Sequence, residues 1–556
     1  MRSRSTSRTA LIALSLAAAS FAAACGSSPG MGTTPPPVEE ASFTIALAAE
    51  TLPVLQGGTA SVEVTLTRKA GFTGAVTLSD AGLPAGASFA PVVIAEGETK
   101  ATLVATALAD APHSLPTSVT IRGTAGALHD EEPLTVTIYG APGTLDTSFA
   151  SGGKLAVPVG IADDYAFAMA AQPDGKLLIA GRAAEHKGDL ALVRLERDGA
   201  VDTSFGVAGK VMTDVAGGAD TAYAVAVQAD GKIVVAGAAI VTGTAPDFVV
   251  ARYLPTGALD TTFGAAATPG LVTTAFGDDA DTAYALVIQP DGKIVVGGES
   301  SQGTSKTGID FALARYDANG ALDATFGDVA TPGKVVTAIA SSSGRDSIYA
   351  LALQEVAGER RIVAAGGEGD FVLARYTANG QLDVGFGAGG KIARVFDSVI
   401  GAARAVQVAA DGKLLVAGNT HHDFALVRLG QSGQLDATFG GSAAGKVVTP
   451  VSATNWDEAQ GLALENDGKI VVAGWAYEGN SSSGNFALAR YATDGALDAT
   501  FGGTGTVVTP VASGTKADQG SAVLLQIDER IPAVRVVVAG SANGSNSDFA
   551  IARYWR

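Results

Sequence analysis

Short runs in which apolar and polar residues alternate follow one another along nearly all of the chain after residue 40. A side-chain period of two is that of a half-buried β-strand, because successive side chains of a strand point to opposite faces. Gly, Pro, Asp and Asn separate the runs, and these residues favour tight turns. The pattern predicts an all-β protein built from many short strands.

Residues 40–141 form a first module with seven of these runs. The runs are Phe43–Ala48, Ala60–Arg68, Ala75–Ser79, Ala87–Ala95, Thr99–Ala107, Ser118–Gly123 and Leu134–Tyr139. Seven strands in about 100 residues fit a sandwich of two sheets. The loop Gly82–Gly86 (GLPAG) resembles the GLPxG loop of bacterial Ig-like surface modules, which implies an Ig-like β-sandwich. We expect this module to be a spacer, with ligand binding as the alternative.

Residues 142–556 contain seven copies of one repeat. A block of the form LD-x-x-F has its aspartates 53 to 63 residues apart, at Asp146, Asp202, Asp260, Asp323, Asp383, Asp436 and Asp498. A block related to DFALARY has its arginines at Arg194, Arg252, Arg315, Arg375, Arg428, Arg490 and Arg553. A third block, DGKIVVAG or a close variant, occurs in five copies.

Each repeat is predicted to hold four strands, a to d. In the second repeat they are Lys210–Val215, Ala222–Gln228, Lys232–Ala236 and Phe248–Tyr253. Strands b and c meet at a D-G pair, which is a strong hairpin signal. Seven repeats of four antiparallel strands predict a seven-bladed β-propeller of four-stranded blades, with a linear stack as the alternative. An extra LD-x-x-F block before the first blade supplies the connector that the last repeat lacks, which favours a closed ring.

Three sequence blocks give these repeats a specific resemblance. LDxxFG, QPDGKIVVAG and DFALARY resemble the bacterial delta-60 repeat over residues 143–556. The resemblance implies a β-propeller in a secreted or surface protein, and it implies no particular enzymatic activity.

The N-terminus has the pattern of an export signal. Arg2, Arg4 and Arg8 precede an apolar run that ends at Ala24, too short for a membrane-spanning helix. Residues 1–24 are therefore predicted to be a signal peptide. The stretch Ala22–Cys25 resembles a bacterial lipobox, which implies lipidation of Cys25, although an incidental cysteine is the alternative. Residues 25–39 form a Gly/Ser/Pro linker. We expect a lipoprotein anchored by its lipid in the outer membrane or at the cell surface.

Composition and net charge limit the fold and the classes of binding partner that the protein could have. The chain has 71 Gly in 556 residues, where an ordinary share of about 7% would give roughly 39; this surplus suits many tight turns. The net charge of -18 argues against a nucleic-acid partner, because binding nucleic acid needs a basic surface. One cysteine allows no intramolecular disulfide.

Loop lengths distinguish two faces of the predicted propeller. The c–d loops hold 3 to 11 residues, whereas the b–c turns and d–a connectors are nearly uniform. Variable loops on a rigid scaffold are the usual place for recognition, so the face of the a–b and c–d loops is the candidate binding face. Its candidate residues are Trp475 and the aspartates before strand b, Asp164, Asp220, Asp281, Asp346, Asp457 and Asp518. These carboxylates either cap their own turns or form a ring that attracts cations, calcium among them. No metal-binding motif supports the second interpretation, and no cofactor is expected.

The repeated charges suggest a structural role. The seven arginines of strand d and the seven aspartates of LD-x-x-F recur in every repeat, and buried charges need partners. We hypothesise a belt of ion pairs between neighbouring blades.

The sequence of the repeats contains no complete catalytic motif among those considered. Gly440–Lys446 lacks the Ser or Thr of a P-loop, and neither G-x-S-x-G nor H-E-x-x-H occurs. We expect a monomeric, non-enzymatic binding or scaffold protein whose ligand is an extracellular protein or glycan. The alternative is a hydrolase or lyase at the central channel. It requires a non-repeating polar cluster there, and no such departure from the repeat is expected.

Overall fold

The computed structural model describes residues 40–184, 187–241, 245–301, 308–339, 345–396, 400–452, 456–477, 484–512, 517–528, 533–544 and 546–556. The predicted signal peptide, linker and Cys25 lie outside these residues. The described part of the chain is all-β apart from one 3-10 turn at Gly441–Ala443, as predicted. It contains no helix long and apolar enough to cross a membrane.

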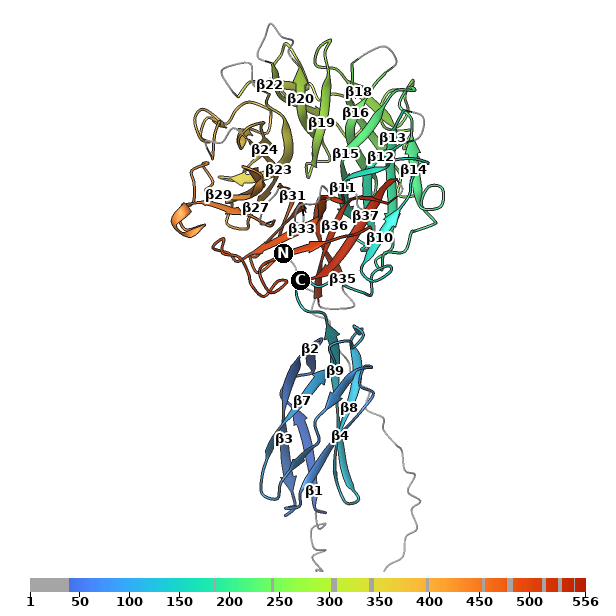
Figure 1. Cartoon of the computed structure of the whole chain (residues 1–556), viewed down its shortest axis with the longest axis vertical. Coiled ribbons are helices and arrows are strands. Elements are labelled where there is room, and N and C mark those ends of the chain that lie inside the picture. The colour runs from blue at the N-terminus through green and yellow to red at the C-terminus, as the bar shows by residue number, and fades with distance from the viewer. Residues whose placement is uncertain are drawn as a thin grey trace, which may run out of the picture.

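Residues 40–141 fold as two sheets that enclose one apolar core (Figure 1). The first sheet has the order β1 (Ser42–Leu47), β3 (Thr59–Lys69), β7 (Lys100–Ala107), β5 (Ala87–Phe89). The second has the order β2 (Thr51–Leu55), β9 (Leu128–Tyr139), β8 (Thr117–Ala125), β4 (Val76–Ala81), β6 (Val92–Ile94). Alternate residues of β3 and β8, such as Val62, Val64, Val119 and Ile121, fill the core. We call this unit the N-terminal module.

Two strand predictions for this module were wrong, both because of proline. The pattern missed β2, which contains Pro53 and pairs only with β9 at the edge of its sheet. An edge strand tolerates proline because one side of it needs no partner. The predicted strand Ala87–Ala95 is divided by Pro91 into β5 and β6, which belong to different sheets.

Residues 154–555 form seven four-stranded antiparallel sheets among the described residues, arranged around a common axis (Figure 1). In order from the axis outwards, the first four are β11 (Tyr165–Ala171) to β14 (Lys210–Thr213), β15 (Asp220–Val227) to β18 (Leu271–Thr274), β19 (Asp281–Ile288) to β22 (Lys334–Thr337), and β23 (Ile348–Val356) to β26 (Lys391–Ile392). The other three are β27 (Gly401–Val408) to β30 (Lys446–Thr449), β31 (Asp457–Leu464) to β34 (Thr506–Thr509), and β35 (Gln519–Asp528), β36 (Ala533–Asn543), β37 (Ser547–Trp555) and β10 (Lys154–Val157).

The second and third strands of these sheets are covered by neighbouring sheets on both faces. Strands β12 (Leu177–Ala183), β13 (Asp189–Leu195), β16 (Ile233–Ala239) and β17 (Asp247–Tyr253) are almost wholly buried. Each apolar cluster joins neighbouring sheets, so that Leu178 of β12 packs with Val249 of β17. Neighbouring sheets are therefore held together face to face.

The sheets do not coincide with the sequence repeats, which corrects the predicted blade. The expected strand a of the second repeat, β14, pairs with β13 of the first repeat instead of joining β15. Each sheet thus takes its outermost strand from the next repeat. The last sheet takes β10 from the beginning of the ring, with Leu155 opposite Ile551. The ring closes through this pairing, and β11 contacts both β15 and β35.

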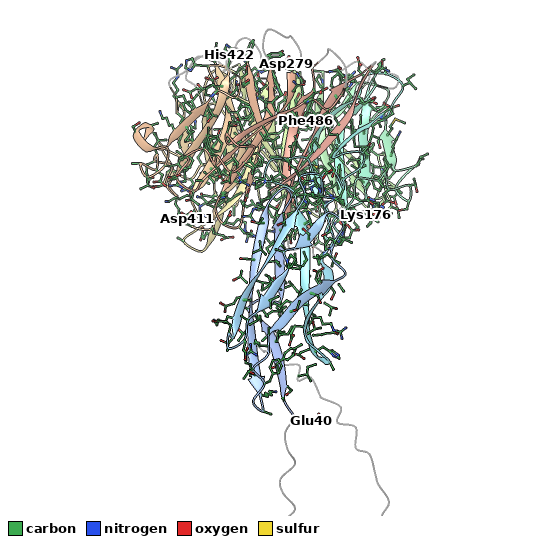
Figure 2. The ribbon with its side chains drawn as sticks, turned by 60° about the horizontal axis from the view of Figure 1, so that its bottom comes forward. Glu40, Lys176, Asp279, Asp411, His422 and Phe486 are labelled. Atoms are coloured by element: carbon green, nitrogen blue, oxygen red, sulfur yellow. The ribbon has the colours of Figure 1, made fainter. Side chains whose placement is uncertain are left out.

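The N-terminal module joins one face of the ring. In Figure 2, Lys176 and Asp411 from the hairpins between first and second strands lie on the side of this module. Asp279 and His422, from the other set of loops, lie on the opposite side. We call the side that carries Asp279 and His422 the loop face. Because the module is attached elsewhere, it leaves the loop face uncovered.

Trp555 fills the joint between the module and the ring. Its ring meets His113 and Tyr139 edge-on, with centroids 4.6 and 5.7 Å away. The guanidinium carbon of Arg535 lies 3.5 Å from the centroid of the indole on the ring side. Trp555 is only 3% exposed and thus belongs to both units.

Candidate functional site

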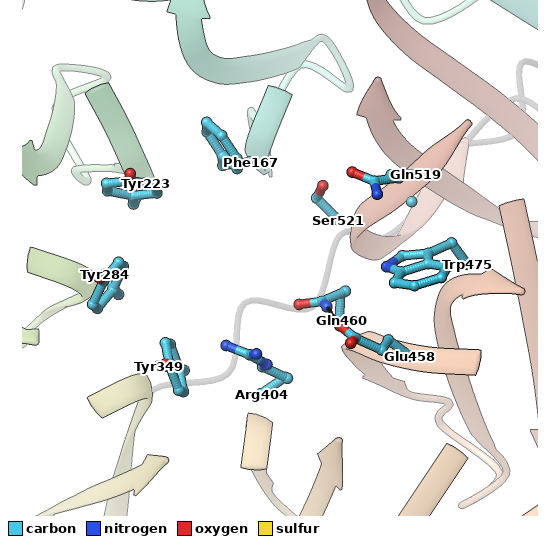
Figure 3. A pocket seen from close by; sticks show the side chains of 11 residues that line it. Phe167, Tyr223, Tyr284, Tyr349, Arg404, Glu458, Gln460, Trp475, Gln519 and Ser521 are labelled. Atoms are coloured by element: carbon cyan, nitrogen blue, oxygen red, sulfur yellow. Dashed lines mark hydrogen bonds between the residues drawn. The ribbon is translucent and has the colours of Figure 1, made fainter. Parts of the chain in front are cut away.

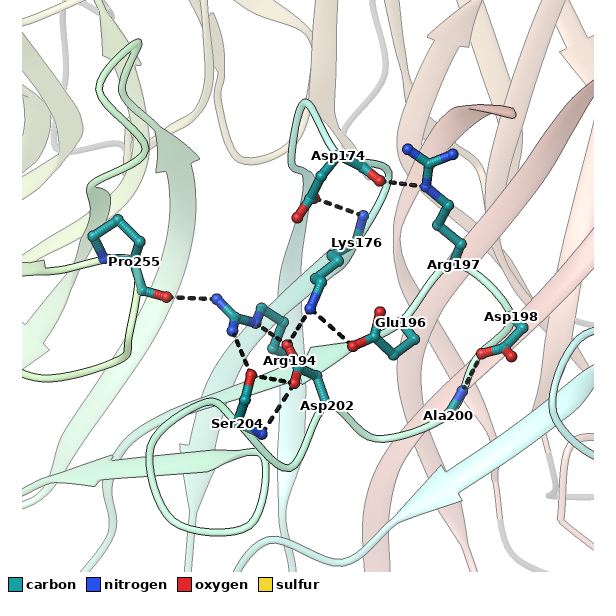
Figure 4. A network of polar contacts seen from close by, with 10 residues as sticks. All are labelled: Asp174, Lys176, Arg194, Glu196, Arg197, Asp198, Ala200, Asp202, Ser204 and Pro255. Atoms are coloured by element: carbon teal, nitrogen blue, oxygen red, sulfur yellow. Dashed lines mark hydrogen bonds and ion pairs between the residues drawn. The ribbon is translucent and has the colours of Figure 1, made fainter. Parts of the chain in front are cut away.

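A cluster of charged groups recurs seven times on the side of the ring that faces the N-terminal module. Figure 4 shows the copy around Asp202. Oδ2 of Asp202 accepts from Nε of Arg194 and from Nζ of Lys176, each at 2.7 Å. Arg194 also donates from an Nη to the carbonyl oxygen of Pro255, which belongs to a turn beside the next sheet. The cluster therefore joins two sheets.

The same arrangement is present in every sheet of the ring. The arginine–aspartate distances are 2.7 to 3.0 Å for Arg194–Asp202, Arg252–Asp260, Arg315–Asp323, Arg375–Asp383, Arg428–Asp436, Arg490–Asp498 and Arg553–Asp146. Each arginine also stacks on the phenylalanine of its LD-x-x-F block, 4.5 to 4.7 Å from the ring centroid. In six of the seven clusters the pairing joins the aspartate to the strand just before it, and Asp146 pairs with the last strand of the chain. The link to the neighbouring sheet runs through a backbone carbonyl, as from Arg194 to Pro255.

A second cation in each cluster was not foreseen from the sequence. It comes from the second strand of the sheet or the turn before it, and its distance to the aspartate is 2.7 to 3.2 Å, for Lys176, Lys232, Lys293, Arg361, Lys413, Lys469 and Arg535. Burial alone would raise the pKa of Asp202, but hydrogen bonds from Lys176, Ser204 and Arg194 outweigh it and hold this pKa well below its usual range. We call the seven clusters the ion-pair belt. Its contacts are internal and lie away from the loop face.

The six candidate aspartates of the loop face are buried inside their loops. Oδ2 of Asp164 accepts from the backbone N–H groups of Val159 and Gly160, and Oδ1 accepts from that of Ala184. Asp220, Asp281, Asp346, Asp457 and Asp518 also accept from backbone N–H groups of the preceding loop. All six are at most 5% exposed. They cap turns, and they do not form an exposed ring of carboxylates.

A β-bulge at the same position in all seven innermost strands aims one side chain at the axis of the ring. The strand register shifts at this residue in each sheet, so that it has no partner opposite. The bulged residues are Phe167, Tyr223, Tyr284, Tyr349, Arg404, Gln460 and Ser521. Bulges of this kind redirect a side chain and are frequent beside functional sites.

A repeated glycine on the second strand makes room for each bulge. A Cβ on Gly237 would lie 1.8 Å from the carbonyl oxygen of Thr221, which no side chain tolerates. The six equivalent glycines give 1.8 or 1.9 Å, at Gly181, Gly298, Gly366, Gly418, Gly474 and Gly540. The glycine that ends the DGKIVVAG block is therefore required by the close approach of the bulged strand.

The bulged side chains line a central cavity of about 350 Å³ (Figure 3). Glu458, Trp475, Gln519 and Gly520 complete its wall. Glu458 is the second residue of β31, Gln519 is the first residue of β35, and Trp475 lies near the end of β32 (Ile470–Tyr477). These strand ends adjoin the loop face, so the cavity is located at that end of the ring axis.

The wall of the cavity is chemically divided. Four aromatic rings from consecutive sheets follow one another, with centroids 4.9 Å apart for Phe167–Tyr223, 5.0 Å for Tyr223–Tyr284 and 5.2 Å for Tyr284–Tyr349. We call them the aromatic arc. Arg404, Gln460 and Ser521 occupy the equivalent positions in the remaining three sheets. The repeat thus determines where these side chains lie, while their chemistry differs around the ring.

Hydrogen bonds and charge define the polar half of the cavity. Nε2 of Gln460 donates to Oε2 of Glu458 at 3.0 Å. Burial raises the pKa of the Glu458 carboxyl, and the charge of Arg404 partly opposes this. The guanidinium carbon of Arg404 lies 4.1 Å from the ring centroid of Tyr349. Behind the arc, the hydroxyl of Tyr284 donates to Glu299, which also pairs with Arg345.

The expectation that no irregular polar cluster departs from the repeat was wrong. The cavity brings together arginine, glutamate, glutamine and tyrosine from positions that differ among repeats. Trp475, which the sequence had singled out, lies in its wall. The missed signal was the residue after the alanine in DTAYA, whose equivalents read Phe, Tyr, Tyr, Tyr, Arg, Gln and Ser.

Among the described residues, one group of three carboxylates has the spacing of a cation site. Oxygens of Asp189, Asp214 and Asp220 lie within 4.8 Å of one another. Burial, together with the charges of Asp214 and Asp189, raises the pKa of Asp220 to about 6. These carboxylates are the residues that could hold calcium. Asp189 begins β13, Asp214 follows β14, and Asp220 begins β15 of the next sheet, so the group lies between two sheets and is separate from the residues of the central cavity.

Six segments of the chain match a family model described as a domain of unknown function (DUF5122) beta-propeller. They are residues 172–205, 228–263, 289–326, 356–386, 409–439 and 465–501. Each begins after the bulged residue and ends on the phenylalanine of the next LD-x-x-F block. The match supports a propeller-repeat family for this chain. It covers most residues of the ion-pair belt and none of the bulged residues that line the cavity.

Solved structures show only weak likeness. A tail fiber of a Staphylococcus aureus phage is 9% identical, with a TM-score of 0.23 over 49% of this chain and 50% of the tail fiber chain. The match therefore spans about half the length of the tail fiber chain. A DUF4784 family protein from Bacteroides caccae is 12% identical, with a TM-score of 0.26 over 88% of this chain and 98% of the other. Domains 5–6 of the S-layer protein SbsC are 16% identical, with a TM-score of 0.14 over 41% and 94%. No curated protein matches the chain.

Proposed function

We propose that this protein is an exported, non-enzymatic binding protein that takes an extracellular ligand, a glycan or a protein, in the central cavity on its loop face. In this proposal the ring is a seven-bladed β-propeller and the N-terminal module is an Ig-like spacer. A lipid on Cys25 anchors the protein at the outer membrane or cell surface. Attachment of the module opposite the loop face supports the proposal, because it leaves the cavity directed away from the anchor.

One observation carries the binding role. Seven equivalent bulges direct one side chain each into a single cavity, and these side chains combine an apolar aromatic arc with a few polar groups. Apolar walls with a small number of placed polar groups are typical of ligand sites. The bulge and its glycine are uniform, whereas the bulged residue varies, as expected where a scaffold is constant and a binding surface is specialised.

The tyrosines favour binding over proton abstraction. Burial raises the pKa of Tyr223, and burial together with the charge of Glu299 raises that of Tyr284. Both phenols remain protonated at neutral pH and therefore serve as hydrogen-bond donors, not as bases. The alternative is a hydrolase or lyase in the same cavity, for which the raised pKa of Glu458 is the supporting observation, since it favours a general acid.

The test is a binding screen with the purified full chain carrying Cys25→Ser, which removes the proposed lipidation site. Cell-surface glycans and secreted proteins are offered, and the product mixtures are examined for cleavage. We expect binding without turnover, which the double variant Tyr349→Ala/Trp475→Ala abolishes. Trp456→Ala is the matched control, because Trp456 is 45% exposed and lies outside the cavity wall. Equal binding by both variants would overturn the proposal, and turnover would favour the enzyme.

A further inference from the structure

We infer that the ligand of the central cavity is an oligosaccharide that carries a carboxylate, with Arg404 contacting the carboxylate and the aromatic arc packing against the sugar rings. This inference rests on the proposed function and names the ligand class within it. It is carried by the arc, by the state of Arg404 and by the polar groups opposite the arc.

The aromatic arc fits the apolar face of a sugar. A pyranose ring presents C–H groups on its faces and hydroxyls around its edge, so it needs a flat apolar surface beside hydrogen-bonding groups. Phe167, Tyr223, Tyr284 and Tyr349 provide a continuous run of rings with neighbouring centroids 4.9 to 5.2 Å apart. Aromatic side chains combine such apolar surface with a polar tip in tyrosine.

The polar half of the cavity fits the hydroxyl edge. Gln460, Gln519 and Ser521 offer amide and hydroxyl groups that both donate and accept hydrogen bonds, as sugar hydroxyls require. The volume of about 350 Å³ lies at the lower end of the range for small-molecule sites. It therefore suits the end of an oligosaccharide better than a folded protein surface.

Arg404 supplies the charge preference. It stands where the preceding four repeats place an aromatic ring, and it lies against Tyr349 at the end of the arc. Its Nε is buried and meets no hydrogen-bond acceptor within the described part of the chain. No carboxylate among the described residues lies within ion-pair distance of its guanidinium, in contrast to the arginines of the ion-pair belt. A half-buried cation that has no carboxylate at ion-pair distance is stabilised by an anionic ligand.

The neighbourhood of Arg404 favours a carboxylate over a phosphate or sulfate ester. A planar guanidinium and a carboxylate form two parallel hydrogen bonds. Glu458 lies close enough for the charge of Arg404 to affect its pKa. When ionised, the Glu458 carboxyl repels a phosphate dianion more strongly than a singly charged carboxylate. Uronic acids are the sugars that combine pyranose faces with a single carboxylate.

The experiment compares acidic oligosaccharides with their own neutral forms by titration calorimetry on the full chain carrying Cys25→Ser. The probes are oligomers of galacturonate, glucuronate and mannuronate, each paired with its methyl ester, which keeps the sugar and removes the charge. We expect at least one acid to bind about 10- to 100-fold more tightly than its ester, the range of a charge-assisted hydrogen bond. Added salt should reduce this preference.

Four variants assign the preference for the acid to its residues. Arg404→Gln should remove the acid–ester difference, and Arg404→Lys should retain part of it. Tyr223→Ala, in the part of the aromatic arc away from Arg404, should weaken acid and ester equally, and Trp456→Ala should change neither. Melting temperatures of all variants separate loss of binding from loss of folding. Equal affinity for acids and esters would overturn this inference and leave the proposed binding function standing. Failure of every saccharide to bind would overturn the inference and direct the proposed function to a protein ligand.

Discussion

Nε of Arg535 donates to Oδ2 of Asp146 at 2.8 Å, although 389 residues separate the two in the chain. Asp146 precedes the first sheet and Arg535 belongs to the last, so this pair completes the ion-pair belt where the ends of the ring meet. Arg553 contacts the same carboxylate at 2.9 Å. The closing cluster differs from the other six in that arginine replaces the lysine found in five of them and His113 of the N-terminal module lies 3.7 Å from the same carboxylate.

Loss of one belt arginine should destabilise the ring strongly. Arg315 is 5% exposed in its side chain and pairs with Asp323 at 2.9 Å, so Arg315→Ala leaves a buried carboxylate without one of its two cationic partners. Breaking a buried pair in this way costs about 3–5 kcal/mol, and the remaining Lys293 places the expected loss near the lower end. Chemical and thermal unfolding measure the change.

Arg360→Ala is the matched control for the belt prediction. Arg360 pairs with Glu355 at 2.7 Å, but both side chains are exposed. Pairs of this kind contribute less than about 1 kcal/mol. Equal losses in the two variants would contradict a structural role for the belt.

The glycine opposite each bulge should tolerate no side chain. In Gly237→Ala the new Cβ would meet the carbonyl oxygen of Thr221 at 1.8 Å, so the bulge must shift or the strands must separate. We expect a loss of at least about 2 kcal/mol, the scale of overpacking in a rigid interior. Gly277→Ala is the control, because its Cβ would meet nothing within 4 Å. Similar melting temperatures for both variants would contradict this account of the bulge.

Stability should depend on pH in two opposite ways. Burial raises the pKa of Asp220 and of Asp457 to about 6 from 3.8, so the folded protein binds these protons more tightly than the unfolded chain. Stability therefore rises as pH falls through 6 and gains no more below 3.8. In the ion-pair belt the pKa values are lowered, so that stabilisation is present above 3.8 and is lost as pH falls further.

Melting temperatures between pH 3 and 8 test this dependence. The melting temperature should be highest at about pH 4–5. In this range the gain from protonating Asp220 and Asp457 is nearly complete, and the loss from protonating the aspartates of the ion-pair belt has hardly begun. Asp220→Asn and Asp457→Asn should each flatten the rise between pH 7 and pH 4. A melting temperature that falls steadily from pH 7 to pH 5 would contradict the prediction.

The proposed anchor depends on one side chain. If a thioether-linked lipid is attached at Cys25, Cys25→Ser should move the protein from the detergent phase to the aqueous phase in a Triton X-114 partition of cell extracts. The central cavity should keep its affinity, because it lies on the far side of the ring from the N-terminal module. An unchanged partition would refute lipidation.

Local sequence patterns were sufficient for much of the fold. The period-two runs located most strands, and the LD-x-x-F and DFALARY blocks located all seven clusters of the ion-pair belt. The pairing of Arg194 with Asp202 could be anticipated because both are repeated, and their separation of eight residues is short. Lys176 was missed as a third member of the cluster because it comes from the turn just before β12, 26 residues before the aspartate.

The division of strands among sheets could not be read from the repeat. A repeat specifies its period, but the point where one sheet ends and the next begins depends on which neighbour pairs with β14. The same holds for β10, whose partner β37 is nearly 400 residues away along the chain.

The central cavity depended on the tertiary structure for the same reason. Tyr223, Arg404 and Gln460 are unremarkable strand residues one at a time, and periodicity places each only on one face of its strand. They become neighbours because seven bulges turn equivalent positions toward one axis. Repetition along the chain thus determined the strands, turns and buried charges, each of which has a local signature. Closure of the ring decided which side chains meet at its centre, because that contact forms only between strands distant in sequence.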